Sequence, residues 1–195
     1  MFNDLSSLPN FLATRRSGKP RDMISPGPDD AQLKAILGSA MRVPDHGKLA
    51  PWKLVVIPPE RRTAFAELLK SAYRAEKPEA GRLELEAMDQ FAHQAPCLVA
   101  VLSTPVVGSK IPQWEQQLSA GSVCMQLLNA AHAQGFVGGW LTGWPAYNPH
   151  VKAALGGTDD DQIAGYIFIG SPAKAQEERP RPDFDSVVST WHAPK

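Results

Sequence analysis

Three short apolar segments constrain the fold of this chain more than any other feature of its sequence. They are residues 53–57, 97–103 and 163–169, which are rich in Val, Ile and Leu and bounded by Pro, Ser or Gly, as is typical of strands. Longer segments with an apolar stripe at helical spacing separate them, without a one-to-one alternation of helix and strand. This pattern predicts an α+β protein of packed helix and sheet layers.

The remaining segments are assigned by the same periodicity. Helices are predicted over residues 3–15, 33–41, 60–76, 80–93, 114–134 and 148–155. Gly135 is predicted to end the fifth of these helices, because glycine is favoured just past a helix C-terminus. Phe184–Trp191 is predicted as one more strand, which must pair with a sheet edge of its own chain or of a partner.

Length, charge and cysteine usage narrow the class of protein. The chain has 195 residues, enough for one sizeable core, so residues 1–195 are predicted to form a single domain. Lys plus Arg and Asp plus Glu each total 20, which gives no electrostatic reason to expect nucleic acid. No membrane-length apolar run and no leader are evident, so a cytoplasmic location is expected. Cys97 and Cys124 are predicted to be small buried side chains, and no His or Cys pair has metal-ligand spacing.

Two basic, loop-like segments predict an anion site. The first is Arg-Arg-Ser at residues 15–17, and the second is residues 42–52, which lead into the first apolar strand. Guanidinium groups pair with phosphate oxygens in a bidentate manner, and a serine hydroxyl adds a small rotatable donor. Alternative interpretations are ordinary helix C-terminal cations at 15–16, a solvated loop lysine at Lys19 and a solvent-facing turn histidine at His46.

Aromatic and glycine residues bear on the same question. Trp52 begins a strand and is predicted to anchor the core or an interface. Trp114 and Trp144 are compatible either with packing or with lining an apolar ligand site. Gly138-Gly139 is not a dinucleotide fingerprint, because its spacing is wrong and it begins a strand after a helix. A nicotinamide would therefore bind transiently and without a Rossmann domain.

Five motifs occur in order along nearly the whole chain. They are Arg15-Arg16-Ser17, Met41–His46 followed by Pro51-Trp52, Pro112–Gln116 with Ser119–Gly121, Ala133–Trp140, and Ile169–Pro172. Together they resemble the nitroreductase superfamily, in particular its small single-domain bacterial NAD(P)H nitroreductases. The resemblance implies a mainly antiparallel central sheet flanked by helices, in an interwoven homodimer whose C-terminal strand is exchanged onto the partner.

The resemblance also implies a cofactor site, with FMN at the subunit interface and NAD(P)H as a transient hydride donor. The cofactor-binding positions carried over are Arg15, Arg16, Ser17, Lys19, Arg42, His46, Lys48, Trp140, Leu141 and Thr142. The first three would hold the phosphate and ribityl chain, Arg42 and His46 would come from the opposite subunit, and residues 140–142 would lie along the flavin. A lysine, Lys19 or Lys48, would place positive charge near the flavin ring. No catalytic residue and no metal is implied, because the flavin carries the redox chemistry.

Three positions depart from the family pattern. Lys48 and Ala50 stand where many relatives carry amide side chains, and Leu141 replaces an arginine of the close subgroup. The implied function is an FMN-dependent oxidoreductase that accepts hydride from NAD(P)H and reduces a small electrophilic acceptor, nitroaromatic or quinone-like. Because pocket groups are lost, a flavin storage or sensor protein with little turnover is the second hypothesis, and a colourless dimeric scaffold is the third.

Overall fold

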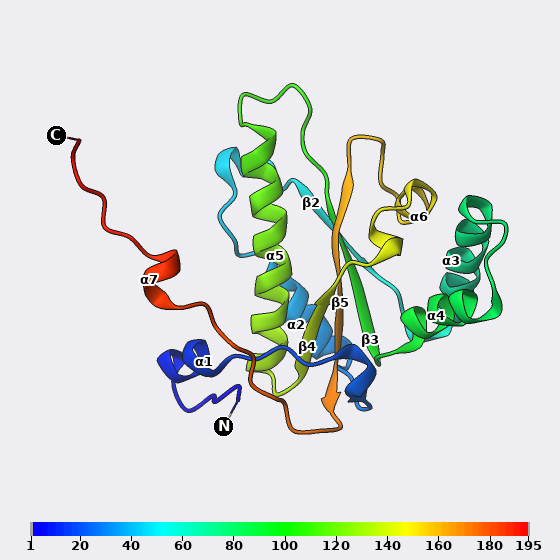
Figure 1. The fold of residues 1–195 in the computed structure, drawn as a ribbon, viewed down its shortest axis with the longest axis horizontal. Coiled ribbons are helices and arrows are strands. Elements are labelled where there is room, and N and C mark those ends of the chain that lie inside the picture. Colours follow the sequence, from blue (N-terminus) through cyan, green and yellow to red (C-terminus); the bar gives the residue numbers. More distant parts are fainter. Residues whose placement is uncertain (1, 195) are drawn as a thin grey trace.

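The computed structural model describes residues 2–194, and Figure 1 traces their course. The α-helices are α1 Leu8–Thr14, α2 Asp30–Ala40, α3 Arg62–Glu76, α4 Arg82–His93, α5 Gln113–Ala133, α6 Pro149–Ala154 and α7 Phe184–Val187; the strands are β1 Met23–Ile24, β2 Trp52–Val56, β3 Cys97–Ser103, β4 Val137–Leu141 and β5 Gln162–Pro172. Short 3-10 helices are η1 Pro20–Asp22, η2 His46–Lys48, η3 Pro59–Arg61 and η4 Trp144–Ala146. The six predicted helices and the three apolar strands are all among them.

The sheet is antiparallel in every pairing. β5 lies at its centre between β3 and β4, and β2 pairs with the outer side of β3. β1 joins the C-terminal end of β5, where Met23 pairs with Pro172 and Ile24 with Ser171. The prediction of an α+β fold with a mainly antiparallel sheet is confirmed.

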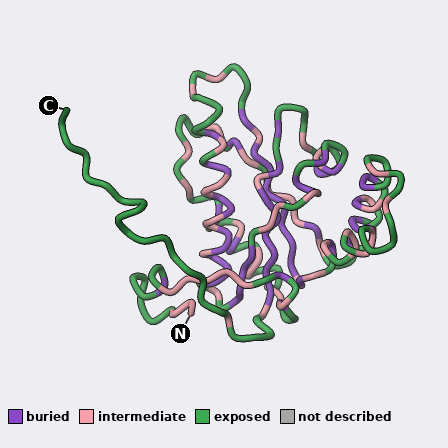
Figure 2. Tube along the Cα trace, in the orientation of Figure 1, coloured by how far each residue is buried: buried purple, intermediate pink, exposed green. Residues whose placement is uncertain are grey.

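Side chains of the central strands alternate between two cores, one on each face of the sheet. On β3, Val99 and Val101 belong to the core under α2 and α5, whereas Leu98 and Leu102 belong to the core under α3, α4 and α6. All seven positions of β3 are buried, which is why its sequence is a continuous apolar run rather than an alternating one. Figures 1 and 2 show the buried strands between these two helical layers.

Helix boundaries follow from local chemistry. Pro9 is accommodated in the first turn of α1, where Ser7 provides the N-cap, because the first turn needs no intrahelical N–H donor. Asp29 and Gln32 form a reciprocal capping box at the start of α2. Gly135 adopts a positive φ of 84° just after α5, so the predicted end of that helix is confirmed.

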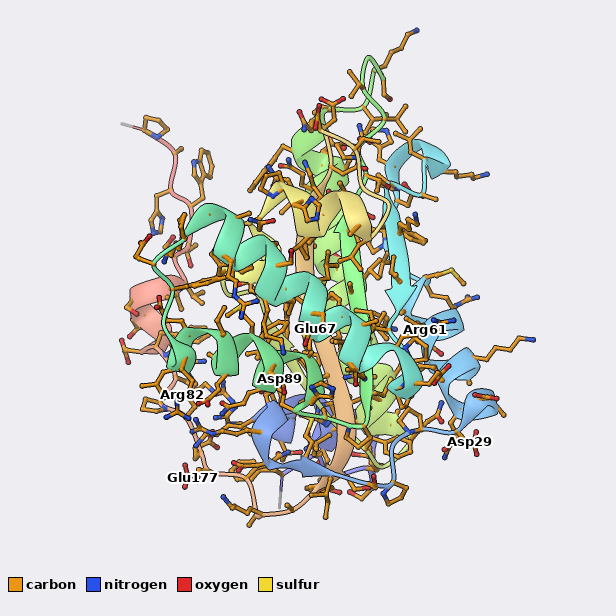
Figure 3. All side chains as sticks on the ribbon, turned by 90° about the vertical axis from the view of Figure 1, so that its right-hand side faces the viewer. Asp29, Arg61, Glu67, Arg82, Asp89 and Glu177 are labelled. Atoms are coloured by element: carbon orange, nitrogen blue, oxygen red, sulfur yellow. The ribbon has the colours of Figure 1, made fainter. Side chains whose placement is uncertain are left out.

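A buried arginine fixes the base of the helical hairpin that α3 and α4 form, here called the α3–α4 hairpin. Arg62 is only 3% exposed, and its guanidinium donates to the carbonyl oxygens of Ile57 at 2.7 Å and Ala92 at 2.8 Å. Because no carboxylate offsets the burial, the pKa of Arg62 is lowered to about 10. Figure 3 looks onto the hairpin, with Glu67 on α3 and Asp89 on α4.

The C-terminal segment differs from its prediction. Within one chain, residues 184–191 are not a strand: Phe184–Val187 forms the single turn α7, and an irregular, exposed stretch follows. A strand needs a hydrogen-bonded neighbour, and this segment runs away from the sheet (Figure 1). It therefore satisfies its backbone locally, as in the 2.9 Å bond from the N–H of Val188 to the carbonyl of Phe184. Exchange of this segment onto a partner remains a prediction.

The cysteines are placed as predicted. Cys97 and Cys124 are free and buried, and burial raises the pKa of Cys97 to about 11 and that of Cys124 to about 12. Thiols with such pKa values are inert at neutral pH.

Within residues 2–194, no helix combines the length and the apolar character that crossing a membrane requires.

Candidate functional site

The segment that follows α1, residues 15–19, lies along β4 and is here called the arm. The N–H of Gly18 donates to the carbonyl oxygen of Gly138 at 3.0 Å. A Cβ atom on Gly139 would approach the Gly18 carbonyl oxygen to 2.7 Å. The Gly138-Gly139 pair thus allows the arm to approach the strand, since any side chain at Gly139 would push it away.

The arm brings four of the predicted site residues into one cluster. Arg15 Nη1 donates to Ser17 Oγ at 3.2 Å, and Arg16 Nη1 donates to the Ser17 carbonyl oxygen at 3.2 Å. Arg16 Nε also donates to the carbonyl oxygen of Glu177 at 2.9 Å. Lys19 Nζ lies 3.5 Å from the Glu177 carboxylate. The arm therefore gathers two guanidinium groups, an ammonium group and a hydroxyl group.

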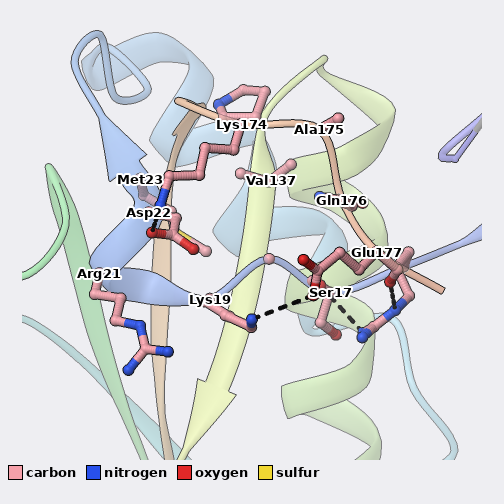
Figure 4. Close-up of a pocket in the computed structure, with 13 residues that line it drawn as sticks. Ser17, Lys19, Arg21, Asp22, Met23, Val137, Lys174, Ala175, Gln176 and Glu177 are labelled. Atoms are coloured by element: carbon pink, nitrogen blue, oxygen red, sulfur yellow. Dashed lines mark hydrogen bonds and ion pairs between the residues drawn. The ribbon is translucent and has the colours of Figure 1, made fainter. Parts of the chain in front are cut away.

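Positive charge is crowded at this cluster. The pKa of Arg15 is lowered, first by burial and then by repulsion from Arg181 and Arg16. A cavity of about 180 Å³ opens beside the arm and is lined by Arg16, Lys19 and Glu177 among others; Figure 4 shows the Lys19 ammonium turned toward Glu177 across it. An anion bound between these cations would relieve their repulsion, so the donor set fits a phosphate group.

The three residues at the end of β4 divide between its two faces. Leu141 shares with Gly139 the face on which the arm lies, and it packs against the core of the α3–α4 hairpin. Trp140 points to the opposite face, where its Nε1 donates to the Ala164 carbonyl oxygen at 3.0 Å and 39% of the residue is exposed. Thr142 is half-buried just after the strand. The strand end is thus next to the arm, but the Trp140 ring is not on the arm's face.

The second basic segment has an unusual backbone. Gly47, Lys48 and Ala50 have positive φ angles of 77°, 56° and 46°, which costs energy at the two residues that carry a Cβ. The Asp45 carboxylate holds this turn, because it accepts the N–H groups of Leu49 at 3.1 Å and Ala50 at 2.8 Å. Strained backbone of this kind is typical of functional segments.

Side chains of this segment contact the start of α5. His46 Nδ1 lies 2.8 Å from Glu115 Oε2 in the first turn of that helix, whereas Arg42 and Lys48 are exposed. We call residues 42–50 the η2 loop. The structure thus places the predicted residues Arg42, His46 and Lys48 in one exposed loop, whose His46 contacts the N-terminal end of α5.

The arm and the η2 loop lie at opposite ends of α5. At the C-terminal end, the His132 ring lies 6.3 Å from the ring of Phe11, which belongs to the helix before the arm. Glu115 and His132 are 17 residues apart in the same helix, which corresponds to roughly 25 Å at 1.5 Å per residue. One chain therefore does not bring all the predicted site residues together (Figure 1).

Exposed apolar side chains form a stripe along part of α5, and others lie on α1. Trp114 and Leu118 on α5 are 67% and 51% exposed, and Leu8 and Leu12 on α1 are exposed as well. Met125 continues the stripe along α5 and is half-buried. Apolar surface of this extent is typical of an interaction surface.

Comparison with known proteins identifies the family. A family model described as "Nitroreductase family" matches residues 12–171. The chain belongs to the nitroreductase family. This confirms the predicted family, and the nitroreductase family is a family of oxidoreductases, as predicted.

Individual relatives in this family cover most of the chain. A protein of Escherichia coli strain K12 named "Putative NAD(P)H nitroreductase YdjA" is 34% identical over 162 residues, which are 83% of this chain and 86% of that protein. A Haemophilus influenzae protein named "Putative NAD(P)H nitroreductase" is 34% identical over 173 residues, which are 88% of this chain and 91% of its own length.

Solved structures share the fold of this nitroreductase-family chain. A nitroreductase-like family protein from Bacillus cereus superimposes with a TM-score of 0.80 at 20% identity, covering 99% of this chain and 100% of that one. An FMN and NADPH-dependent nitroreductase, NfnB, from Sphigopyxis sp. strain HMH gives a TM-score of 0.71 at 20% identity, covering 93% and 97%. These similarities confirm the predicted fold.

Some residues around the site were not predicted. Glu177 and Glu76, a residue discussed below, hold other side chains in place but lie outside any motif, and Asp45 lies within a motif without having been assigned a role. The residues next to Asp45 could have indicated its role, because an Asp before a His-Gly turn tends to accept hydrogen bonds from nearby backbone N–H groups. Among residues 2–194, no group of three His, Cys, Asp or Glu side chains is arranged to hold a metal ion.

Proposed function

We propose that residues 1–195 form one FMN-binding domain of an oxidoreductase that takes hydride from NAD(P)H and reduces a small electrophilic acceptor, nitroaromatic or quinone-like. The observation that supports it most directly is the arm of this nitroreductase-family chain: Arg16, Ser17 and Lys19 line a cavity, and Arg15 donates to the Ser17 hydroxyl. The names of the relatives, and the FMN and NADPH dependence of NfnB, support the same cofactors.

The arm would hold the phosphate end of FMN. Arg15 and Arg16 would pair with the phosphate oxygens, and Ser17 Oγ would donate to one of them. When bound, FMN supplies the hydride-transfer chemistry. The cavity in one chain, at about 180 Å³, is smaller than the roughly 300–1,000 Å³ that ligand pockets usually have. The flavin ring would therefore extend along β4 toward Thr142, where one chain encloses it incompletely.

A homodimer would complete the site. A two-fold axis across α5 reverses the helix direction, so it would place the η2 loop of one copy near the arm of the other. The exposed side chains of Trp114 and Leu118 would be covered in that interface. Arg42, His46 and Lys48 would then reach the flavin bound on the partner's arm. An interwoven interface should bury about 2,000–5,000 Å².

A spectroscopic experiment tests the proposed reaction. The purified protein should be yellow or take up added FMN, and mixing it with NADPH or NADH under anaerobic conditions should bleach the flavin absorbance within seconds. Adding a nitroaromatic compound or a quinone should then restore the oxidised spectrum. A flavin spectrum that persists in the presence of both nicotinamides would favour the storage or sensor hypothesis, which the loss of pocket groups at Ala50 and Leu141 keeps in consideration. A protein that takes up no FMN would favour the scaffold.

Deletion of the tail tests the dimer. Phe184, Val187 and Trp191 are 69%, 64% and 79% exposed in one chain, so they would be covered only by a partner. Removing residues 184–195 should shift the protein toward monomers in analytical ultracentrifugation and lower its FMN content. A truncated variant that remains an FMN-loaded dimer would contradict strand exchange while leaving the flavin chemistry intact.

A further inference from the structure

The tip of the α3–α4 hairpin is fastened to the segment that follows β4. Glu76, the last residue of α3, accepts a hydrogen bond from Trp144 Nε1, which lies 3.1 Å from each of its carboxylate oxygens. Glu76 Oε2 also accepts from Asn148 Nδ2 at 3.0 Å. Trp144 begins η4, and Asn148 caps α6, where its Oδ1 accepts the N–H of Val151 at 3.0 Å. We call Glu76, Trp144 and Asn148 the latch.

Packing fixes the indole of the latch as well. The rings of Tyr73 and Trp144 meet edge to face, with centroids 4.8 Å apart, a favourable geometry for an aromatic pair. Tyr73 is buried, and its hydroxyl donates to Glu84 Oε1 on α4 at 2.9 Å. The bonds from Trp144 and then Asn148 lower the pKa of Glu76, so the acceptor is ionised at neutral pH. The Trp144 ring is thus held from α3 at both its N–H and its side.

The latch is not needed to attach the hairpin to the sheet. The base of the hairpin is already held by Arg62, which is buried and bonded to the carbonyls of Ile57 and Ala92. The latch is at the other end of α3, 14 residues away along the helix, which is about 21 Å. The N–H of Trp144 and the amide of Asn148 both donate to one carboxylate, so their effect is to orient Trp144 and η4.

The position of η4 connects the latch to the proposed flavin site. Thr142 ends the segment proposed to lie along the flavin, Gly143 turns the chain with a φ of 66°, and Trp144 follows at once. Tyr147, at the end of η4, is 76% exposed. Two aromatic side chains therefore follow within five residues of Thr142, at the end of β4 toward which the flavin ring is proposed to extend.

We propose that Glu76 is a positioning residue that holds Trp144 as an aromatic wall of the acceptor site and so favours planar aromatic acceptors. This inference rests on the proposed function. Glu76→Gln keeps the size of the side chain but replaces one acceptor oxygen with a donor that faces Trp144 or Asn148. Trp144→Phe keeps a ring beside Tyr73 and removes the N–H that Glu76 accepts.

The test compares an aromatic acceptor, menadione, with a non-aromatic one, ferricyanide, on the FMN-loaded protein. Glu76→Gln and Trp144→Phe should each raise the KM for menadione by about three- to tenfold, the value of one aromatic contact. Neither should change the KM for ferricyanide, the affinity for FMN or the rate of bleaching by NAD(P)H. The Kd of menadione, measured without reductant from the shift of the flavin spectrum, should rise by the same factor. Glu67→Gln, on the same helix and paired with Lys70, is the matched control and should match the wild type.

Two outcomes would overturn the inference. Unchanged menadione KM and Kd in both variants would show that the latch does not shape the acceptor site. Equal losses for both acceptors, together with lower FMN content, would show a structural role only. If Glu76→Gln does not fold, Trp144→Phe decides alone. A wild-type protein that NAD(P)H does not bleach would refute the proposed function, while the menadione Kd would still report on the latch.

Discussion

The two ends of α5 carry the two halves of the candidate site, and they differ in kind. At the C-terminal end, the arm lies against β4 beside a cavity, and Arg15 and the buried His132 are close to one another. At the N-terminal end, the η2 loop is exposed and its backbone is strained. The first end resembles a finished binding site, and the second resembles a surface that acts on something outside its own chain.

This difference explains why one chain gives an incomplete picture of function. We propose that the arm binds the FMN phosphate on its own chain, since its donors already lie close together. The η2 loop keeps left-handed residues at Lys48 and Ala50 at a cost in free energy, although Arg42 and Lys48 are exposed in one chain. Both facts agree with a site shared by two copies. The arm of one copy would provide affinity for FMN, and the η2 loop of the other copy would contact the flavin.

The largest effect should come from the arm. Arg15→Ala combined with Arg16→Ala should weaken FMN binding by about a hundredfold to ten-thousandfold, because each charge-assisted hydrogen bond contributes about 1.5–3 kcal/mol. Arg15→Ala alone should cost about tenfold to a hundredfold, whereas Lys48→Ala in the η2 loop should cost less than about tenfold. Fluorescence titration of the apoprotein measures these affinities. Arg61→Ala, which changes an exposed arginine on the α3–α4 hairpin side, is the control. If it lowered the FMN affinity as much as the arm variants do, the loss would not distinguish the arm from other basic residues.

The second effect concerns pH. His132 is 1% exposed, and burial, then repulsion from Arg15, lower its pKa from 6.5 to about 4. Between pH 4 and pH 6.5, the unfolded state therefore binds more protons than the folded state. The contribution of His132 to the free energy of unfolding is thus complete above pH 6.5 and is lost as the pH falls toward 4. The loss should approach about 2–3 kcal/mol.

Urea unfolding at pH 7.5 and 4.5 measures this dependence. His132→Gln cannot titrate, so the wild-type free energy of unfolding should fall more steeply with pH than that of the variant. Parallel slopes would show that His132 is not held neutral.

The smallest effect is expected in the η2 loop. Ala50→Gly should raise the free energy of unfolding by up to about 1 kcal/mol, because it removes the Cβ from a left-handed residue. Ala75→Gly, in helix α3, should instead lower it by about 1 kcal/mol. Asp45→Ala should cost about 1–2 kcal/mol, since two backbone N–H groups lose their acceptor. Thermal or urea unfolding without FMN gives the sign of each change in the free energy of unfolding. A lower free energy of unfolding for Ala50→Gly would contradict backbone strain at that residue.

Sequence alone predicted the parts of the molecule whose residues are close in the chain. β3 was visible as an apolar run because both of its faces are buried, and the arm was visible because its cations are within five residues of one another. β1 was missed, since two residues carry no periodicity. The tail strand was wrong within one chain, because Val187, Val188 and Trp191 favour a strand but only a neighbouring edge can form one.

Contacts between distant residues could not be predicted in this way. Glu76 is 68 residues from Trp144 and 72 from Asn148, and no spacing rule connects such positions. Glu177 likewise reaches the arm only because β5 ends beside β1. The resemblance to the nitroreductase family supplied the fold and the positions of the candidate site, but not the residues that orient them.

Mixed dimers test the central claim most directly. One chain would carry Arg15→Ala and Arg16→Ala, and the other would carry Arg42→Glu and Lys48→Glu, with different affinity tags to isolate the mixed species. If each site uses the arm of one chain and the η2 loop of its partner, both variant homodimers should bind little FMN, and the mixed dimer should regain one intact site, about half the FMN content of the wild type. A mixed dimer as empty as the two variant homodimers would contradict the account.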